Sequence, residues 1–220
     1  MILRSLHILV ALTLLSGTAL TTTTAHAQTT AFTIPSNPAL RGVTGFTVGY
    51  TFTVGASAIS VTDLGFWDQD QDGLFLSHPI TIWNGSGTSL GTATVPSGTG
   101  ATLDNAYRYV SLGGSPIALA AGQTYTIGAF FPNPGFPNPS DNSPDSISGG
   151  SITAASGIAL GAARFNPFNA FPTGDIVGTG QYMAPNFKFT ASGGGAAPEP
   201  GTLALLALGG VAVLAKRRRK

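Results

Sequence analysis

Apolar and polar residues alternate with a period of two in several segments of the chain. Residues 46–54 place aromatic and aliphatic side chains on one face and Thr or Gly on the other, and residues 124–131 and 186–190 repeat the pattern. This alternation is typical of β-strands that bury one face. Shorter candidate strands cover residues 59–67, 80–83, 89–95 and 107–112.

Turn-forming pairs separate these segments: Asp72-Gly73, Asn84-Gly85, Ser97-Gly98, Gly113-Gly114 and Ala121-Gly122. Strands and turns that recur every ~8–15 residues predict an all-β fold, a single jelly-roll-like β-sandwich over residues 28–191. The Pro-rich stretch 132–144 is expected to be a long loop without regular structure. Residues 145–180 have a less regular pattern that leaves room for one or two short strands.

Composition and charge exclude several classes of protein. The chain has 220 residues, only 9% charged, with 30 Gly, 15 Pro and no cysteine. The fold must therefore be held by apolar burial, and thiolate chemistry and Cys-ligated metal sites are excluded. Residues 28–197 carry four basic residues against eight Asp, a net charge of −4, so no basic patch for nucleic acid is expected.

The N-terminus has the pattern of a secretory signal peptide. Arg4 precedes an apolar run of about ten residues, 6–15, and Ala25 and Ala27 are the small residues that signal peptidase requires before a cut at Gln28. We expect residues 1–27 to be removed. The alternative, an uncleaved membrane helix, is disfavoured because the apolar run is too short to span a bilayer.

The C-terminus contains four ordered parts. A Gly-rich linker, 192–197, is followed by Pro198-Glu199-Pro200, an apolar segment 203–215 and the basic end 216–220. The apolar segment is a predicted helix of roughly 20 Å, short for a bilayer. The basic end would stay on the cytoplasmic side of the membrane.

This ordered set over residues 198–220 resembles the PEP-CTERM sorting signal. The resemblance implies transient anchoring in the inner membrane and cleavage near Pro198-Glu199-Pro200 by an exosortase, a membrane-embedded cysteine protease. It also implies export to the cell surface or extracellular space of a bacterium that makes exopolysaccharide and biofilm matrix. A simple tail anchor is the alternative.

The central segment resembles the domain of unknown function DUF4082 over most of residues 32–190. The resemblance implies an extracellular β domain and carries no established activity. The motifs that support it include Gly49-Tyr50-Thr51-Phe52-Thr53-Val54-Gly55, Leu64-Gly65-Phe66-Trp67-Asp68, Ile82-Trp83, Tyr107-Arg108-Tyr109-Val110 and Ala184-Pro185-Asn186-Phe187-Lys188-Phe189.

Three carboxylates form the candidate metal site. Asp68, Asp70 and Asp72 stand at alternate positions before Gly73, as in the first half of a calcium loop. The twelfth position of an EF-hand would be Pro79 instead of Glu, so an EF-hand is excluded. The open alternatives are a Ca²⁺ site in a hairpin loop and a polar turn in which Asp accepts hydrogen bonds from backbone N–H groups.

Few residues are available for catalysis. His78 is the only histidine in residues 28–191, and Ser77 beside it would point to the opposite face of a strand, so a structural role for His78 is expected. Trp67 and Trp83 could stack on sugar rings if exposed, but each lies in an apolar run that favours burial.

These features together predict an exported, non-enzymatic structural or adhesive protein associated with exopolysaccharide, with no cofactor beyond the candidate Ca²⁺. The alternative is a Ca²⁺-assisted carbohydrate-binding module. A glycoside hydrolase is a third hypothesis, and it would require a cleft with paired carboxylates.

Overall fold

A computed structural model of the chain describes residues 27–35, 38–133, 141–145, 152–176 and 180–192. All regular secondary structure in these ranges is β-strand, which confirms the predicted all-β class. Within the described ranges there is no helix with the length and apolarity that crossing a membrane requires. Residues 1–26 of the predicted signal peptide 1–27, and the predicted C-terminal helix 203–215, lie outside the described residues.

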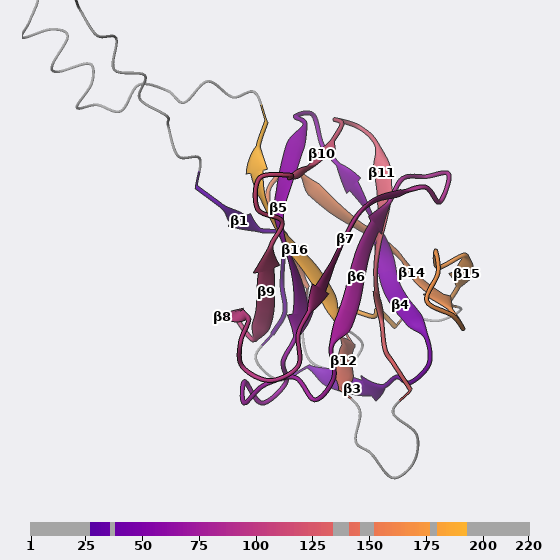
Figure 1. Cartoon of the computed structure of the whole chain (residues 1–220). Helices are drawn as coiled ribbons and strands as arrows, with labels where there is room; N and C mark the ends of the chain where they lie inside the picture. Colours follow the sequence, from indigo (N-terminus) through magenta and orange to yellow (C-terminus); the bar gives the residue numbers. More distant parts are fainter. Residues whose placement is uncertain (1–26, 36–37, 134–140, 146–151, 177–179, 193–220) are drawn as a thin grey trace, which may run out of the picture.

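Two six-stranded antiparallel sheets face each other (Figure 1). In the first, the order is β1 (Thr29–Thr30), β16 (Pro185–Ala191), β5 (Ile59–Trp67), β9 (Tyr107–Ser111) and β8 (Thr102–Asp104), with β10 (Ile117–Leu119) also paired to β5. In the second, the order is β15 (Gly174–Asp175), β14 (Ile158–Asn166), β4 (Thr47–Val54), β11 (Thr124–Phe130), β6 (His78–Trp83) and β7 (Ser89–Val95). We call these sheets and their loops the two-sheet body.

Two smaller sheets accompany the two-sheet body. One pairs β3 (Ala39–Gly42) with β12 (Asn142–Asp145), and the other pairs β2 (Phe32–Thr33) with β13 (Thr153–Ala154). The expectation of no regular structure in 132–144 is wrong at its end, because Asn142, Ser143 and Pro144 pair with β3. Pro is tolerated there since a two-stranded ribbon leaves each strand one unpaired edge. The jelly-roll connectivity stays a prediction.

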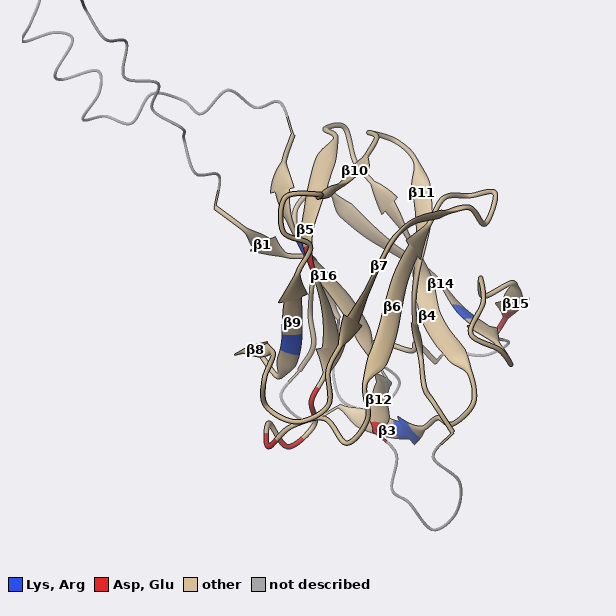
Figure 2. Ribbon diagram, viewed as in Figure 1, with Lys and Arg blue, Asp and Glu red and all other residues tan. Residues whose placement is uncertain are grey.

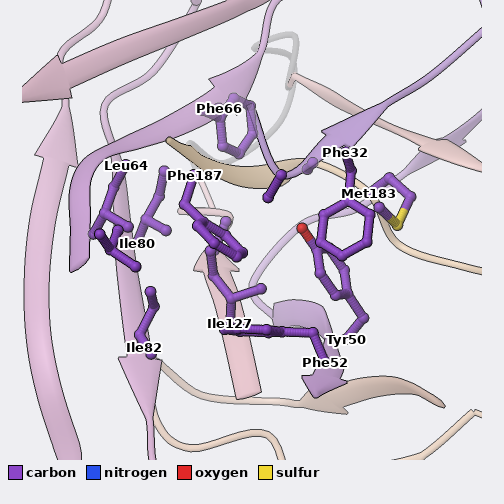
Figure 3. Close-up of a cluster of buried hydrophobic side chains, with 14 of the residues drawn as sticks. Phe32, Tyr50, Phe52, Leu64, Phe66, Ile80, Ile82, Ile127, Met183 and Phe187 are labelled. Atoms are coloured by element: carbon purple, nitrogen blue, oxygen red, sulfur yellow. The ribbon is translucent and has the colours of Figure 1, made fainter. Parts of the chain in front are cut away.

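The hydrophobic core lies between the two large sheets (Figure 3). On β4, Tyr50 and Phe52 are fully buried, as the alternation along that strand predicts. Phe52 meets Phe187 of the opposite sheet with ring centroids 4.8 Å apart. Packing of this kind supplies the stability that a protein without disulfides needs.

The pairing of β5 with β16 defines the two ends of the two-sheet body. Ala191 pairs with Ile59, whereas Pro185 pairs with Phe66 at the other end of the same strand. The end with Ile59 and Ala191 is called the tail end, since the described chain ends there at Ser192. The opposite end is called the loop end, and it carries the β5–β6 loop, residues 68–77, together with β3 and β12 (Figure 1).

Candidate functional site

Asp68 organises the β5–β6 loop. It directly follows β5, is only 3% exposed, and accepts hydrogen bonds from the backbone N–H groups of Gln71 at 3.1 Å and Gly73 at 3.2 Å. Its Oδ2 also accepts a 2.6 Å bond from Nε of Arg108 on β9. Of the two alternatives from the sequence, Asp68 adopts the one in which the side chain caps backbone N–H groups.

Arg108 joins three segments of the loop end. Its guanidinium is buried and donates to the carbonyl oxygens of Thr99 and Ala101, both at 3.2 Å, and of Gln71 at 3.1 Å. A buried ion pair is tolerated when hydrogen bonds satisfy its remaining donors and acceptors, as they do here. The pair therefore fixes the β5–β6 loop against the chain that precedes β8.

The three candidate calcium ligands lie in one loop but differ in their surroundings. Asp70 and Asp72 are exposed, while the Asp68 carboxylate is taken by Arg108 and backbone N–H groups. Over the described ranges, no group of three or more His, Cys, Asp or Glu side chains is arranged to hold a metal ion. The alternate spacing of the three Asp residues does not reveal that the Arg108 side chain, distant in the sequence, pairs with Asp68.

His78 begins β6 and is buried in the core. Its ring stacks on Phe66, with centroids 3.7 Å apart. The Nδ1 atom lies 3.0 Å from the carbonyl oxygen of Phe130, and Nε2 lies 2.9 Å from Oδ2 of Asp141. Both ring nitrogens therefore lie within hydrogen-bonding distance of an oxygen atom.

Asp141 is the partner that completes this arrangement. Burial raises the pKa of its carboxyl, but hydrogen bonds from His78 and from the backbone N–H groups of Phe75 and Leu76 outweigh burial and hold the pKa below its ordinary 3.8. Asp141 is thus a stable anion that ties β6, the β5–β6 loop and the start of β12 together.

Both tryptophans are buried. Trp67 is 5% exposed and packs edge-on against Tyr107, and its indole N–H has no partner among the described residues. Trp83 is 7% exposed and is covered by Phe171 from the loop between β14 and β15. At these exposures little of either ring surface is accessible for a sugar to stack on.

Two adjacent hollows lie at the loop end and share Trp67 and Gln69. The acidic hollow, about 250 Å³, is lined by residues that include Asp68, Asp70, Asp72 and Asp141. The amide hollow, about 410 Å³, is lined by Thr33, Ile34, Pro35, Trp67, Gln69, Gln71, Asn105 and Ala106. Figure 2 shows acidic segments in the loops of this end, near β3 and β12.

The amide hollow gathers unusual backbone conformations. Within the described ranges, the non-glycine residues with positive φ are Gln71 (62°), Asn105 (49°) and Ala106 (61°), and all three line this hollow. Asn105 and Ala106 form the two-residue connection between β8 and β9, where positive φ at both positions is the type I′ turn. Such conformations cost free energy and often cluster at functional sites.

Sequence reasoning pointed to the right loop but missed the residues that shape it. Arg108 and Asp141 were not singled out, nor were the amides of Gln71 and Asn105. One signal was available for Arg108, because a charged residue inside the apolar strand pattern Tyr107-Arg108-Tyr109-Val110 indicates a buried partner. Asp141 carries no comparable signal in a Pro-rich stretch.

The predicted processing residues fall mostly outside the described residues. Ala25 and the motif Pro198-Glu199-Pro200 are among those that are not described. Gln28, the expected first residue after signal removal, donates from Nε2 to Oγ1 of Thr62 at 2.9 Å and to Oδ2 of Asp63 at 2.6 Å. These bonds attach the start of the described chain to β5.

Comparison with known proteins gives two family matches. The family model of a domain of unknown function, DUF4082, matches residues 32–184, and the PEP-CTERM protein-sorting motif matches residues 196–220. No curated protein matches the chain. The first match covers all residues of the two hollows and both large sheets apart from β1 and β16, and the second covers Pro198-Glu199-Pro200.

Proposed function

Because the chain belongs to the DUF4082 family and carries a PEP-CTERM sorting motif, we propose that it is a non-catalytic structural or adhesive protein associated with exopolysaccharide. The sorting motif marks it as an exosortase target and an exported cell-surface protein. The proposal concerns the structural or adhesive role of the β domain after export to the cell surface.

The observation that carries this proposal is the separation of the tail end from the loop end. The sorting segment follows Ser192 in the sequence, and the backbone N–H of Ser192 donates a hydrogen bond to the carbonyl oxygen of Ala58 at the tail end. The two hollows lie past Trp67, at the far end of the nine-residue β5. At about 3.3 Å per residue, this strand separates the two ends by roughly 30 Å. A domain held by its tail therefore presents the hollows outward.

The ionisable side chains of the loop end support a binding role over catalysis. A glycosidase general acid needs a raised pKa, whereas the pKa of Asp141 is lowered by its hydrogen bonds even though burial opposes this. Asp68 is committed to Arg108 and to backbone N–H groups. His78 is committed to two oxygen acceptors, so it is poorly placed to serve as a general base.

Deletion of the gene in the host tests the proposal. Cell aggregation, floc formation and retention of exopolysaccharide on the cells should fall, and the full-length gene should restore them. A gene that lacks residues 198–220 should not restore surface retention, and this truncation is the matched control for sorting. Unchanged aggregation and polysaccharide retention after deletion would reject the structural or adhesive role, and depolymerisation of the polysaccharide by purified protein would reject its non-catalytic character.

A further inference from the structure

We propose that the amide hollow binds a neutral, hydroxyl-rich sugar unit of a polysaccharide. This inference rests on the proposed function for the source of the ligand, but the site itself is argued from the residues that line it. It requires no metal ion, unlike the calcium-assisted module considered from the sequence.

The polar lining matches sugar hydroxyls. The side chains of Gln69, Gln71 and Asn105 are amides, and Thr33 adds a hydroxyl. An amide presents donors and an acceptor together, as does a hydroxyl, so the two groups pair in either direction. Ile34 and Pro35 add apolar surface that suits the C–H faces of a sugar ring.

Counting partners among the described residues, each of the three amides retains unused hydrogen-bonding groups. Gln69 accepts a bond from Asn142 through Oε1, which leaves its NH₂ group, and Asn105 donates to Asp104, which leaves its carbonyl oxygen. The side-chain amide of Gln71 has no partner among the described residues. A ligand can therefore be bound without breaking internal bonds.

The walls of the hollow are held in place before any ligand arrives. Both backbone groups of Gln71 form hydrogen bonds with the Asp68–Arg108 ion pair. The N–H donates to Asp68, and the carbonyl oxygen accepts from Arg108. The carbonyl oxygen of Ala106 accepts a 2.8 Å bond from the backbone N–H of Asp68, which fixes the β8–β9 turn to the same residue. A wall fixed in this way loses less entropy on binding.

The charges around the hollow select against acidic ligands. No Lys or Arg side chain of the described ranges lines it, and Arg108 beneath the loop is buried with its guanidinium hydrogen-bonded to carbonyl oxygens and Asp68. The neighbouring acidic hollow carries the exposed Asp70 and Asp72. These carboxylates repel uronic acids, sulfated sugars and phosphates, so a neutral sugar fits best. The volume of about 410 Å³ lies within the ~300–1,000 Å³ of small-ligand sites.

Calorimetric titration of the mature protein with hexasaccharides tests the site. The probes are neutral gluco-, manno-, xylo- and N-acetylglucosamine series, and an oligogalacturonate serves as the acidic probe. We expect at least one neutral series to bind, the acidic probe to bind more weakly, and EDTA to leave the affinity unchanged. The inference would be overturned if no neutral hexasaccharide bound, or if the oligogalacturonate bound more tightly than the neutral series. Binding of a peptide library in place of sugars, or loss of sugar affinity in EDTA, would also overturn it.

A double variant locates the binding. Gln71→Gly with Asn105→Gly removes two amides while glycine retains the positive φ that both positions require. The affinity should fall about tenfold or more, and the melting temperature should be kept or raised. The matched control is Gln123→Ala, which removes an exposed amide at the tail end and should bind normally.

Unchanged affinity in the double variant would overturn the assignment to this hollow. The same variant, expressed in the gene-deleted host, separates the two proposals. Loss of sugar binding with normal aggregation would reject the hollow as the source of adhesion and leave the proposed function standing. Unchanged aggregation in the deletion strain itself would reject the proposed function, whatever the calorimetry shows.

Discussion

His78 and Asp141 are 63 positions apart in the sequence, and their side chains pair in the structure with Nε2 and Oδ2 2.9 Å apart. The pair joins the first residue of β6 to the residue before β12. It also brings Asp141 to the backbone of the β5–β6 loop, where it accepts bonds from Phe75 and Leu76 at 3.0 Å. One carboxylate thus holds the loop end together from three directions.

Acid should weaken this attachment. The folded pKa of Asp141 is below its ordinary value, because hydrogen bonds from His78, Phe75 and Leu76 outweigh the effect of burial. The folded state then binds fewer protons than the unfolded state near pH 4, so stability from Asp141 is complete above that pH and is lost as the pH falls. We expect the melting temperature to drop between about pH 5 and pH 3.

The variant Asp141→Asn provides the control for acid lability. It should melt at a lower temperature than the native protein at pH 7 and should lose less stability between about pH 5 and pH 3, since no proton binds at that site. An equal pH dependence in both proteins would show that other carboxyl groups control the acid transition.

Removing Arg108 should destabilise the fold strongly. Arg108→Met leaves the buried Asp68 carboxylate without its cation, a change that typically costs about 3–5 kcal/mol. Urea unfolding measures the loss, and Asp68→Asn in the same background should recover part of it. The control is Arg164→Met, because the exposed pair Arg164–Asp175 should contribute no more than about 1 kcal/mol. Equal effects of the two Met variants would contradict the buried pair as a stabilising contact.

Ala106→Gly should stabilise the protein. Ala106 is the second residue of a type I′ turn at φ 61°, a position where glycine is favoured. Glycine relieves the strain of the left-handed backbone conformation but has a larger conformational entropy in the unfolded chain. The net effect should raise the free energy of unfolding by about 0.5–1 kcal/mol. The gain is measured by urea unfolding. A loss of stability would mean that the methyl contact with the Trp67, Tyr107 and Tyr109 cluster outweighs the strain.

Gly49→Ala should disrupt the pairing of β4 and β11. A Cβ atom at Gly49 would lie 2.0 Å from the carbonyl oxygen of Ile127, which is backbone and cannot move aside easily. We expect a loss of at least ~2 kcal/mol, in the upper range for overpacked sites. Gly100→Ala is the control, since a Cβ there meets nothing within 4 Å. Equal thermal stability of the two variants would contradict the close approach of these strands.

The long strands were predictable from the sequence because each alternates over one buried face. Residues predicted as 46–54, 59–67 and 124–131 correspond to β4, β5 and β11 within one residue at each end. The two-residue strands are too short to show a period, and their pairing depends on neighbours distant in sequence. In β14 the register shifts between Leu160 and Ala163, so the alternation that would reveal the strand is interrupted.

The site was predictable in position but not in chemistry. The sequence identified Asp68 and Trp67 because acidic spacing and aromatic residues are local patterns. It could not show that Arg108, 40 positions away, pairs with the Asp68 carboxylate while Asp70 and Asp72 stay exposed. The positive φ of Gln71 and Ala106 was equally hidden, because these residue types seldom adopt that conformation.

The antiparallel pairing of β5 with β16 also determines how the domain would respond to mechanical load. A force that pulls on the chain after Ser192, while the β5–β6 loop is held, pulls β16 and β5 along their lengths in opposite directions. The backbone bonds from Pro185–Phe66 to Ala191–Ile59 run across that direction and are strained together rather than one after another. Rupture then requires many bonds to break at once, so this end-to-end direction is the one in which the two strands resist separation best.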